Sequence, residues 1–218
     1  MSRVICIAGE SGSGKTTSAR TLNPETTFYI DADRKGLSWK GWKKQYNAEK
    51  KNYIQTSNVE TIRKIFQKIH SEQTHFKVIV IDTLNTIMVD DEVKRMKEKG
   101  YDKWIDLAQC VWELVSEAHL FRDDLTIVFM AHTQTERDDS GFQFTRIKTS
   151  GRKLEKICLE SKFTTVLIAK CVDGRYVFET QSKNSTAKSP MGCFDEFEIE
   201  NDLSNVIQRM EEYENEEI

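Results

Sequence analysis

The chain has 218 residues, of which 38% are hydrophobic and 31% charged, a composition that suits one globular domain and argues against disorder. No apolar run approaches the ~20 residues that cross a bilayer, and the first apolar run, residues 4–8, is too short for a secretory signal, so we expect no membrane association. The five cysteines are widely spaced without a C-x-x-C motif, which predicts neither a zinc site nor disulfides and favours the reducing cytoplasm.

Charge is unevenly distributed along the chain. The whole chain carries −3, but residues 194–218 hold ten acidic side chains against one base, Arg209, and therefore carry −9. Residues 1–193 then carry +6. A basic body followed by an acidic tail is typical of proteins that handle nucleic acids, and a solvated C-terminal helix with a frayed end is the alternative interpretation.

Apolar segments of strand length alternate with segments of helical periodicity. In chain order, we expect strands over residues 4–8, 27–30, 76–81, 125–131, 163–169 and 176–180. Helices are expected over residues 15–22, after a capping box of Ser57 and Glu60, over residues 108–118 and over residues 203–210. The polar segment 133–151 is expected to be a loop. This alternation predicts an α/β fold: a mostly parallel central sheet flanked by helices, with a C-terminal β-hairpin and helix. We divide it into a core over residues 1–200 and an acidic helix or tail over residues 201–218.

A phosphate-binding motif lies between the first expected strand and the first expected helix. It reads Gly9-Glu10-Ser11-Gly12-Ser13-Gly14-Lys15-Thr16 and fits G-x-x-x-x-G-K-[ST]. Glycines let the backbone curl so that successive N–H groups point at phosphate oxygens, which assigns residues 9–16 and the following Thr17 to nucleotide binding. We expect Lys15 to reach the β- and γ-phosphates and act in catalysis, and the Thr16 hydroxyl to ligate Mg²⁺. A glycine-rich turn without a ligand is the alternative.

A second site residue, Asp82, ends the apolar run over residues 78–81. At the carboxyl edge of a parallel sheet this carboxylate faces the ligand crevice, and in P-loop enzymes such an acid holds Mg²⁺, usually through a water molecule. We therefore expect Thr16 and Asp82 on the metal, with capping of the next turn as the alternative for Asp82. Thr83 follows where several P-loop families place a water-activating glutamate, so the base must come from elsewhere.

The segment Phe28-Tyr29-Ile30-Asp31-Ala32-Asp33 resembles the strand of RecA-like ATPases that ends in hydrophobic residues, Asp, a small residue and the catalytic Glu. The resemblance implies a RecA-like P-loop NTPase core that binds ATP, and it places Asp33 at the position of the base that orients the attacking water. Asp is one methylene shorter than Glu. Asp31 is the alternative base, and a structural role in the turn is the alternative for both carboxylates.

Residues 127–134 are similar to the RecA-like strand whose polar end senses the γ-phosphate and leads into a mobile DNA-binding loop. The resemblance implies His132 as the sensor, with Gln134 as second choice and a structural role as the alternative. The following bases lie near Phe142 and Phe144, a combination that suits single strands because rings stack on bases while cations follow phosphates. The DNA-binding candidates in this segment are Arg146, Lys148 and Arg152, and a plain surface loop is the alternative.

A stronger basic cluster occupies residues 34–51. Seven bases stand there against the single acid Glu49, and Trp39, Trp42 and Tyr46 lie among them. Taking the indoles as exposed, we expect a groove for single-stranded DNA, while a lid or protomer contact with buried aromatic side chains is the alternative. The DNA-binding candidates here are Arg34, Lys35, Lys40, Lys43 and Lys44.

The C-terminal part extends the resemblance. Residues 184–190 and 201–203 look like phage-encoded small RecA-like ATPases of the Sak type, which act in single-strand annealing or recombination. In RecA-like assemblies, basic residues of this region reach the γ-phosphate of the neighbouring protomer, which implies Lys183 and Lys188 as trans-acting candidates; ordinary surface lysines are the alternative. The resemblance also implies single-stranded DNA, a single-strand-binding protein and further copies of the chain as partners, in a host cytoplasm.

These observations together predict a Mg²⁺-dependent ATPase whose ATP-coupled binding of single-stranded DNA serves phage-type homologous recombination or annealing. Two other functions stay open. A small-molecule kinase uses the same kind of phosphate loop, although the sequence shows no clear acceptor motif. A nucleotide-gated protein-interaction module with weak hydrolysis is the third.

Overall fold

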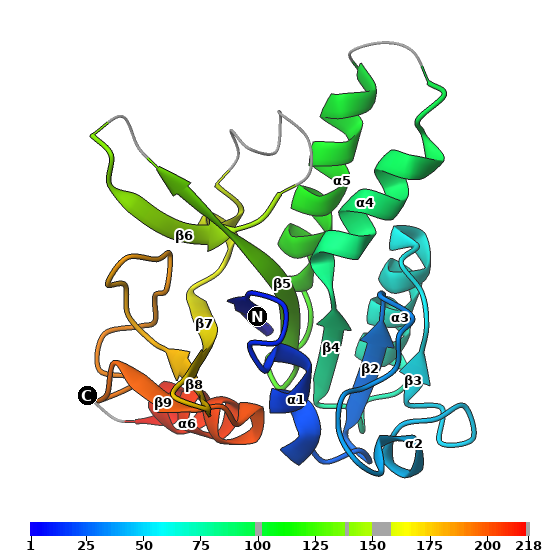
Figure 1. The fold of residues 1–218 in the computed structure, drawn as a ribbon. Helices are drawn as coiled ribbons and strands as arrows, with labels where there is room; N and C mark the ends of the chain where they lie inside the picture. Colours follow the sequence, from blue (N-terminus) through cyan, green and yellow to red (C-terminus); the bar gives the residue numbers. More distant parts are fainter. Residues whose placement is uncertain (99–101, 138–139, 150–157, 217–218) are drawn as a thin grey trace.

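The computed structural model describes residues 1–98, 102–137, 140–149 and 158–216. Helices are labelled α, short 3₁₀ turns η and strands β (Figure 1). In chain order the elements are β1 (Arg3–Gly9), α1 (Lys15–Ser18), η1 (Ala19–Thr21), β2 (Thr27–Asp31), α2 (Trp42–Gln45), β3 (Tyr53–Ile54), α3 (Val59–Ser71), β4 (Val78–Asp82), α4 (Leu84–Lys94), α5 (Asp102–Ala118), β5 (Thr126–Arg137), β6 (Gln143–Ile147), η3 (Leu159–Lys162), β7 (Thr165–Val172), β8 (Arg175–Glu179), β9 (Glu198–Glu200) and α6 (Leu203–Asn215).

One sheet runs through the described part of the chain in the order β3-β2-β4-β5-β1-β7-β8-β9, and β6 lies off this path and pairs with β5. The pairs β1–β5, β1–β7, β2–β3, β2–β4 and β4–β5 are parallel. The pairs β5–β6, β7–β8 and β8–β9 are antiparallel. The predicted fold, a mostly parallel sheet flanked by helices with a C-terminal hairpin and helix, is confirmed.

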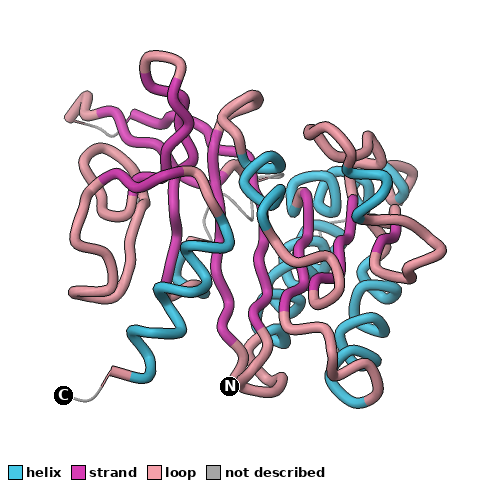
Figure 2. Tube along the Cα trace, turned by 90° about the horizontal axis from the view of Figure 1, so that it is seen from below, coloured by secondary structure: helices cyan, strands magenta, loops and turns pink. Residues whose placement is uncertain are grey.

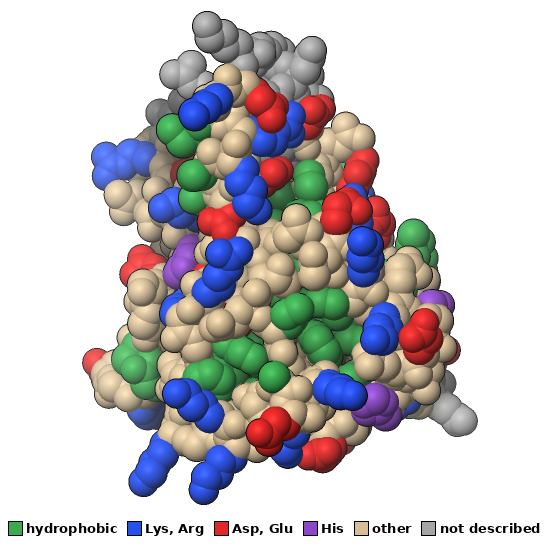
Figure 3. Space-filling model, turned by 90° about the vertical axis from the view of Figure 1, so that its right-hand side faces the viewer, with side chains coloured by type: hydrophobic (Ala, Val, Ile, Leu, Met, Phe, Trp, Pro, Cys, Tyr) green, Lys and Arg blue, Asp and Glu red, His purple; other side chains and the backbone are tan. Residues whose placement is uncertain are grey.

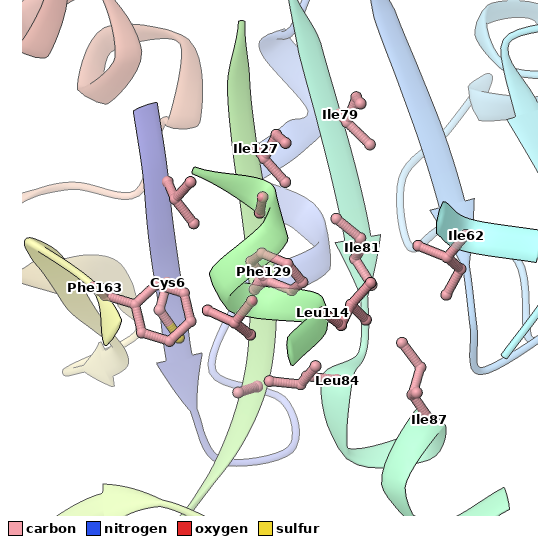
Figure 4. Close-up of a cluster of buried hydrophobic side chains, with 14 of the residues drawn as sticks. Cys6, Ile62, Ile79, Ile81, Leu84, Ile87, Leu114, Ile127, Phe129 and Phe163 are labelled. Atoms are coloured by element: carbon pink, nitrogen blue, oxygen red, sulfur yellow. The ribbon is translucent and has the colours of Figure 1, made fainter. Parts of the chain in front are cut away.

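The sheet has a hydrophobic cluster on each face, because successive residues of a strand point to opposite sides. In β1, Cys6 packs into the cluster covered by α3, α4 and α5, which Figure 4 shows. Its neighbours Ile5 and Ile7 pack into the other cluster, which η1, the segment around α2 and α6 cover. Figure 2 shows the last helix, α6, leading to the C-terminus. Cover on both faces is why the central strands are apolar throughout.

Two helices differ from the sequence-based expectation. The N-cap of α3 is Asn58, whose side chain accepts a hydrogen bond from the N–H of Thr61 at 2.9 Å, so the predicted capping box at Ser57 is wrong. Ser57 instead donates to Asp90 of α4 at 2.5 Å. No helix was expected over residues 84–94, where α4 lies. Its apolar residues share no single face, since Ile87 is buried whereas others such as Val93 are exposed.

The expected loop over residues 133–151 is wrong in its described part. β5 continues to Arg137 and forms a hairpin with β6, in which Thr133 pairs with Ile147. Figure 1 shows this hairpin extending beyond the edge of the main sheet. The β5 residues after Ala131 are half-buried or exposed and lack the apolar pattern that marks a strand in a core. Among the described residues, no helix has both the length and the apolar content needed to cross a membrane.

Candidate nucleotide site

The parallel strands bring the predicted site residues to one edge of the sheet. The register places Gly9 of β1 opposite His132 of β5, and Asp31 of β2 opposite Asp82 of β4. Because parallel strands point the same way, these carboxyl ends share an edge, where open α/β sheets bind their ligands.

The phosphate loop joins β1 to α1 at this edge. Gly12 and Gly14 have φ angles of +80° and +93°, in the left-handed region where a side chain would be strained. A Cβ at Gly9 would lie 2.6 Å from the carbonyl oxygen of Ala169, so only glycine fits there. The loop borders a pocket of about 310 Å³, which we call the phosphate pocket. The residues that line it include Ser11, Gly12, Gly14, Lys15, Thr16 and Thr17.

The predicted phosphate-binding lysine lies inside the loop. The Nζ atom of Lys15 donates to the carbonyl oxygens of Gly9 and Glu10, each at 2.7 Å. Burial of the ammonium lowers the pKa of Lys15 to about 8, even though Asp82 acts in the opposite direction. A desolvated cation held at the mouth of a glycine-rich loop is suited to a polyanionic ligand.

The two predicted metal ligands lie side by side. Thr16 Oγ1 donates to Asp82 Oδ2 at 2.6 Å, and the Tyr29 hydroxyl donates to the same oxygen at 2.9 Å. Burial raises the pKa of Asp82, partly offset by these hydrogen bonds. Its other oxygen, Oδ1, is buried and has no hydrogen-bond partner among the described residues. A hydroxyl beside a carboxylate with an unpaired oxygen fits Mg²⁺, which prefers oxygen ligands and takes the remainder from phosphates and water.

The predicted base is held by three donors. Asp33 Oδ1 accepts hydrogen bonds from the hydroxyls of Thr83, at 3.0 Å, and Thr86. Its Oδ2 accepts from the ammonium of Lys35. Burial acts to raise the pKa of Asp33, but the bonds from Lys35 and Thr86 outweigh it and the net effect lowers the pKa. Asp33 is therefore a carboxylate at neutral pH, as a water-orienting base requires.

The alternative base, Asp31, accepts several hydrogen bonds through one of its oxygens. Asp31 is 1% exposed, and its Oδ2 accepts hydrogen bonds from the backbone N–H of Gly36, the hydroxyl of Tyr53 and the amide of Gln55, at 2.7–3.0 Å. These bonds tie the segment after β2 to β3. The assignment of the base to Asp33, with Asp31 as the alternative, stays a prediction.

The predicted sensor His132 lines the phosphate pocket and is half-buried. Burial, followed by the charge of Lys15, lowers the pKa of His132, so its ring is neutral at pH 7. Asn85 fixes the backbone there, because its Oδ1 accepts from the N–H of His132 at 2.6 Å. The second choice, Gln134, instead donates to Glu136 at 2.6 Å.

The DNA-binding candidates fall into paired and exposed groups. Arg34 donates to Ser57 at 3.1 Å, and Lys35 lines the phosphate pocket beside Asp33. Arg146 is only 14% exposed and lies 3.4 Å from Glu136. Arg34 and Lys35 are nevertheless exposed, as are Lys40, Lys43, Lys44 and Lys148, and Arg152 lies outside the described residues.

The expectation of exposed indoles in the basic segment is wrong. Trp39 and Trp42 are half-buried and pack against the hydrophobic cluster, and Tyr46 is 1% exposed. Lys43 lies 5.8 Å from the ring centre of Trp42. Figure 3 shows Lys and Arg side chains at the lower edge of this face, at the height where Figure 1 places α2. The segment therefore offers cations rather than stacking rings.

The trans-acting candidates lie away from the chain's own phosphate pocket, whose lining includes neither of them. Lys183 is exposed, with its ammonium 5.4 Å from the ring of Phe197. Lys188 exchanges two backbone hydrogen bonds with Val166, at 2.8 and 2.9 Å. A role toward a neighbouring protomer stays a prediction.

Comparison with known proteins gives a family. The model of a family described as an AAA domain matches residues 1–191, most of the chain. The chain belongs to this AAA domain family. Among solved structures, the AAA domain is similar to a KaiC-like protein from the hyperthermophilic archaeon Pyrococcus horikoshii OT3, with 13% identity and a TM-score of 0.42, over 81% of this chain and 76% of that one. None of the curated proteins compared with the chain matches it.

Membership of the family makes the chain a P-loop ATPase domain, in agreement with the phosphate loop. Three residues contribute to the AAA domain's site although no sequence pattern predicts this role. Tyr29 donates to Asp82, Lys35 holds Asp33, and Tyr176 of β8 lines the phosphate pocket. In the sequence, Tyr29 belongs to an apolar strand and Lys35 is one of many bases. Tyr176 lies 160 residues after the end of the loop, and only the fold brings it near.

Proposed function

We propose that this AAA domain is a Mg²⁺-dependent ATPase that couples ATP to the binding of single-stranded DNA, in homologous recombination or annealing of the phage type. The observation that carries the ATPase part is the convergence of Lys15, Thr16, Asp82 and Asp33 at one sheet edge. A cation, a metal-ligand pair and a carboxylate base are the groups that phosphoryl transfer to water requires.

The residues divide the chemistry between them. Lys15 and the backbone N–H groups of residues 10–16 bind and neutralise the phosphates, where catalysis is mainly positioning and electrostatic stabilisation. Thr16 and Asp82 would hold Mg²⁺, which supplies positive charge beside the β- and γ-phosphates. Asp33, kept ionised by Lys35 and two threonine hydroxyls, orients the attacking water and accepts its proton. Neutral His132, which also lines the pocket, supplies a hydrogen bond to the γ-phosphate.

The DNA part rests on the exposed lysines Lys40, Lys43 and Lys44. The neighbouring rings of Trp39 and Trp42 are half-buried and pack against the hydrophobic cluster, so these lysines contact phosphates without rings that stand free for base stacking. Binding through them is independent of sequence and sensitive to salt. Three phosphate contacts give a slope of about −2 in log affinity against log salt concentration for a single strand.

The test is ATP turnover with and without single-stranded DNA, together with DNA affinity with and without ATP. The proposal expects saturable stimulation of turnover and tighter DNA binding with ATP. Lys15→Ala should remove turnover if the phosphate loop performs the reaction, and turnover that persists in this variant would contradict the proposal.

A charge-reversal set assigns the DNA surface. Replacing Lys40, Lys43 and Lys44 by Glu should abolish DNA stimulation and leave basal turnover. The matched control replaces Lys64 and Lys68, exposed lysines of α3, by Glu and should keep stimulation. The coupling would be refuted if DNA left the turnover unchanged and ATP left the DNA affinity unchanged. Turnover stimulated by a metabolite instead of DNA would identify a kinase.

A further inference from the structure

A second pocket of about 640 Å³ adjoins the phosphate pocket. Thr17 and Tyr176 line both pockets, so the two spaces meet beside α1. Two arginines, Arg20 and Arg175, and two glutamates, Glu198 and Glu200, lie in its lining and balance each other. The phosphate pocket has Lys15 and Lys35 in its lining, which suits an anion, whereas the balanced pocket suits a neutral group.

The second pocket contains a buried side-chain amide without hydrogen-bond partners among the described residues, that of Asn201. Asn201 is 2% exposed, and neither its Oδ1 nor its Nδ2 has a hydrogen-bond partner among the described residues. Both atoms lie 3.3 Å from the position that a Cβ on Gly14 would occupy, so the amide is against the phosphate loop. Burying an amide without partners is costly, and such a group in a pocket lining is explained when a ligand completes its hydrogen bonds.

The backbone around Asn201 is held firmly. Its N–H donates to the carbonyl of Tyr176 at 3.3 Å, and its carbonyl accepts from Arg20 at 2.8 Å. The same Arg20 nitrogen donates to the carbonyl of Thr17 at 3.1 Å. These bonds fix the amide relative to α1 before any ligand arrives.

Tyr176 offers a flat surface beside this amide. Tyr176 is 48% exposed, and its Cδ1 atom lies 2.8 Å from the position of a Cβ on Gly14. The ring therefore lies against the phosphate loop with much of its surface open to a ligand. An aromatic ring in this position can stack on a nucleobase.

We propose that the second pocket holds the adenine base of the nucleotide, with Tyr176 stacking on it and Asn201 reading its N6–N7 edge. This inference rests on the proposed binding of a nucleoside triphosphate in the phosphate pocket. The amide oxygen of Asn201 accepts from the N6 amino group and the amide nitrogen donates to N7, which is the pairing that Asn makes with adenine. Guanine presents two acceptors on this edge, O6 and N7, and leaves the amide oxygen without a donor.

The experiment measures the affinities of ATP, GTP, 7-deaza-ATP and inorganic tripolyphosphate by calorimetry with Mg²⁺. We expect ATP to bind about 5- to 150-fold more tightly than GTP, and about 2- to 12-fold more tightly than 7-deaza-ATP, which lacks N7. In Asn201→Leu both preferences should vanish while tripolyphosphate binding is unchanged. The matched control, Asn205→Leu on the exposed side of α6, should keep both preferences.

A second variant does not touch the buried amide. Tyr176→Ala removes an exposed ring and should weaken ATP and GTP alike by about 5- to 150-fold, without changing tripolyphosphate binding. Wild-type protein that binds ATP and 7-deaza-ATP equally, or ATP no better than tripolyphosphate, would overturn the base assignment and leave the ATPase proposal standing. Protein that binds neither nucleotide nor tripolyphosphate would overturn both.

Discussion

ATP binding should weaken as the pH rises, because Lys15 titrates close to neutrality. Lys15 is 5% exposed, and burial lowers its pKa to about 8. Phosphates attract only the protonated form, so the free protein must first gain a proton at higher pH. With a pKa of about 8, roughly nine-tenths of the molecules carry this proton at pH 7 and about one-tenth at pH 9. The affinity for ATP should therefore fall about tenfold, or ~1.4 kcal/mol, between these values.

Calorimetric titration of Mg²⁺-ATP at several pH values between 6.5 and 9.5 measures this effect. Lys15→Arg is the matched variant, because a guanidinium stays protonated over the whole range. Its affinity should differ from that of the wild type but stay nearly constant with pH. Wild-type affinity that is flat from pH 7 to 9, or an arginine variant that falls as steeply, would refute the reasoning.

Three further predictions concern the base and the fold. Asp33→Asn should bind ATP like the wild type and lose about 10²- to 10⁴-fold in kcat, as single-turnover assays can measure; unchanged kcat would remove Asp33 from the mechanism. Lys35→Met takes away a hydrogen bond and a charge that lower the pKa of Asp33, so the acid limb of the pH–rate profile should move to higher pH, and a limb that stays in place or moves down contradicts the pairing. Asn58→Ala removes the cap of α3 and should cost about 0.5–2 kcal/mol in urea unfolding, whereas an unchanged midpoint would show that the cap carries no stability.

The sequence was most informative where function depends on neighbouring residues. The phosphate loop needs glycines, a lysine and a hydroxyl within eight positions, and its place between a strand and a helix is a local property. Asp82 follows an unbroken apolar run, and the direction of parallel strands then brings it to the edge where the loop lies. The alternation of strands and helices was enough to predict the α/β sheet.

Patterns misled where burial does not follow periodicity. α4 has exposed apolar residues, Val89 and Val93, beside buried ones such as Ile87, so its helical period is hidden. β5 continues past His132 with polar side chains because it leaves the core there and pairs with β6. In the basic segment, the sequence showed the charge but not which side chains are buried. Trp39 and Trp42 pack against the hydrophobic cluster rather than standing free as stacking surfaces.

The sequence alone thus determined the chemical class of the site, because a phosphate cradle is built from residues adjacent in the chain. Only the tertiary structure decided which residues complete it. Lys35 reaches Asp33 across a turn, while Tyr176 and Asn201 come from more than 150 residues away to lie against Gly14. Such contacts depend on strand order and on the packing of the sheet's far end, and no local pattern records them.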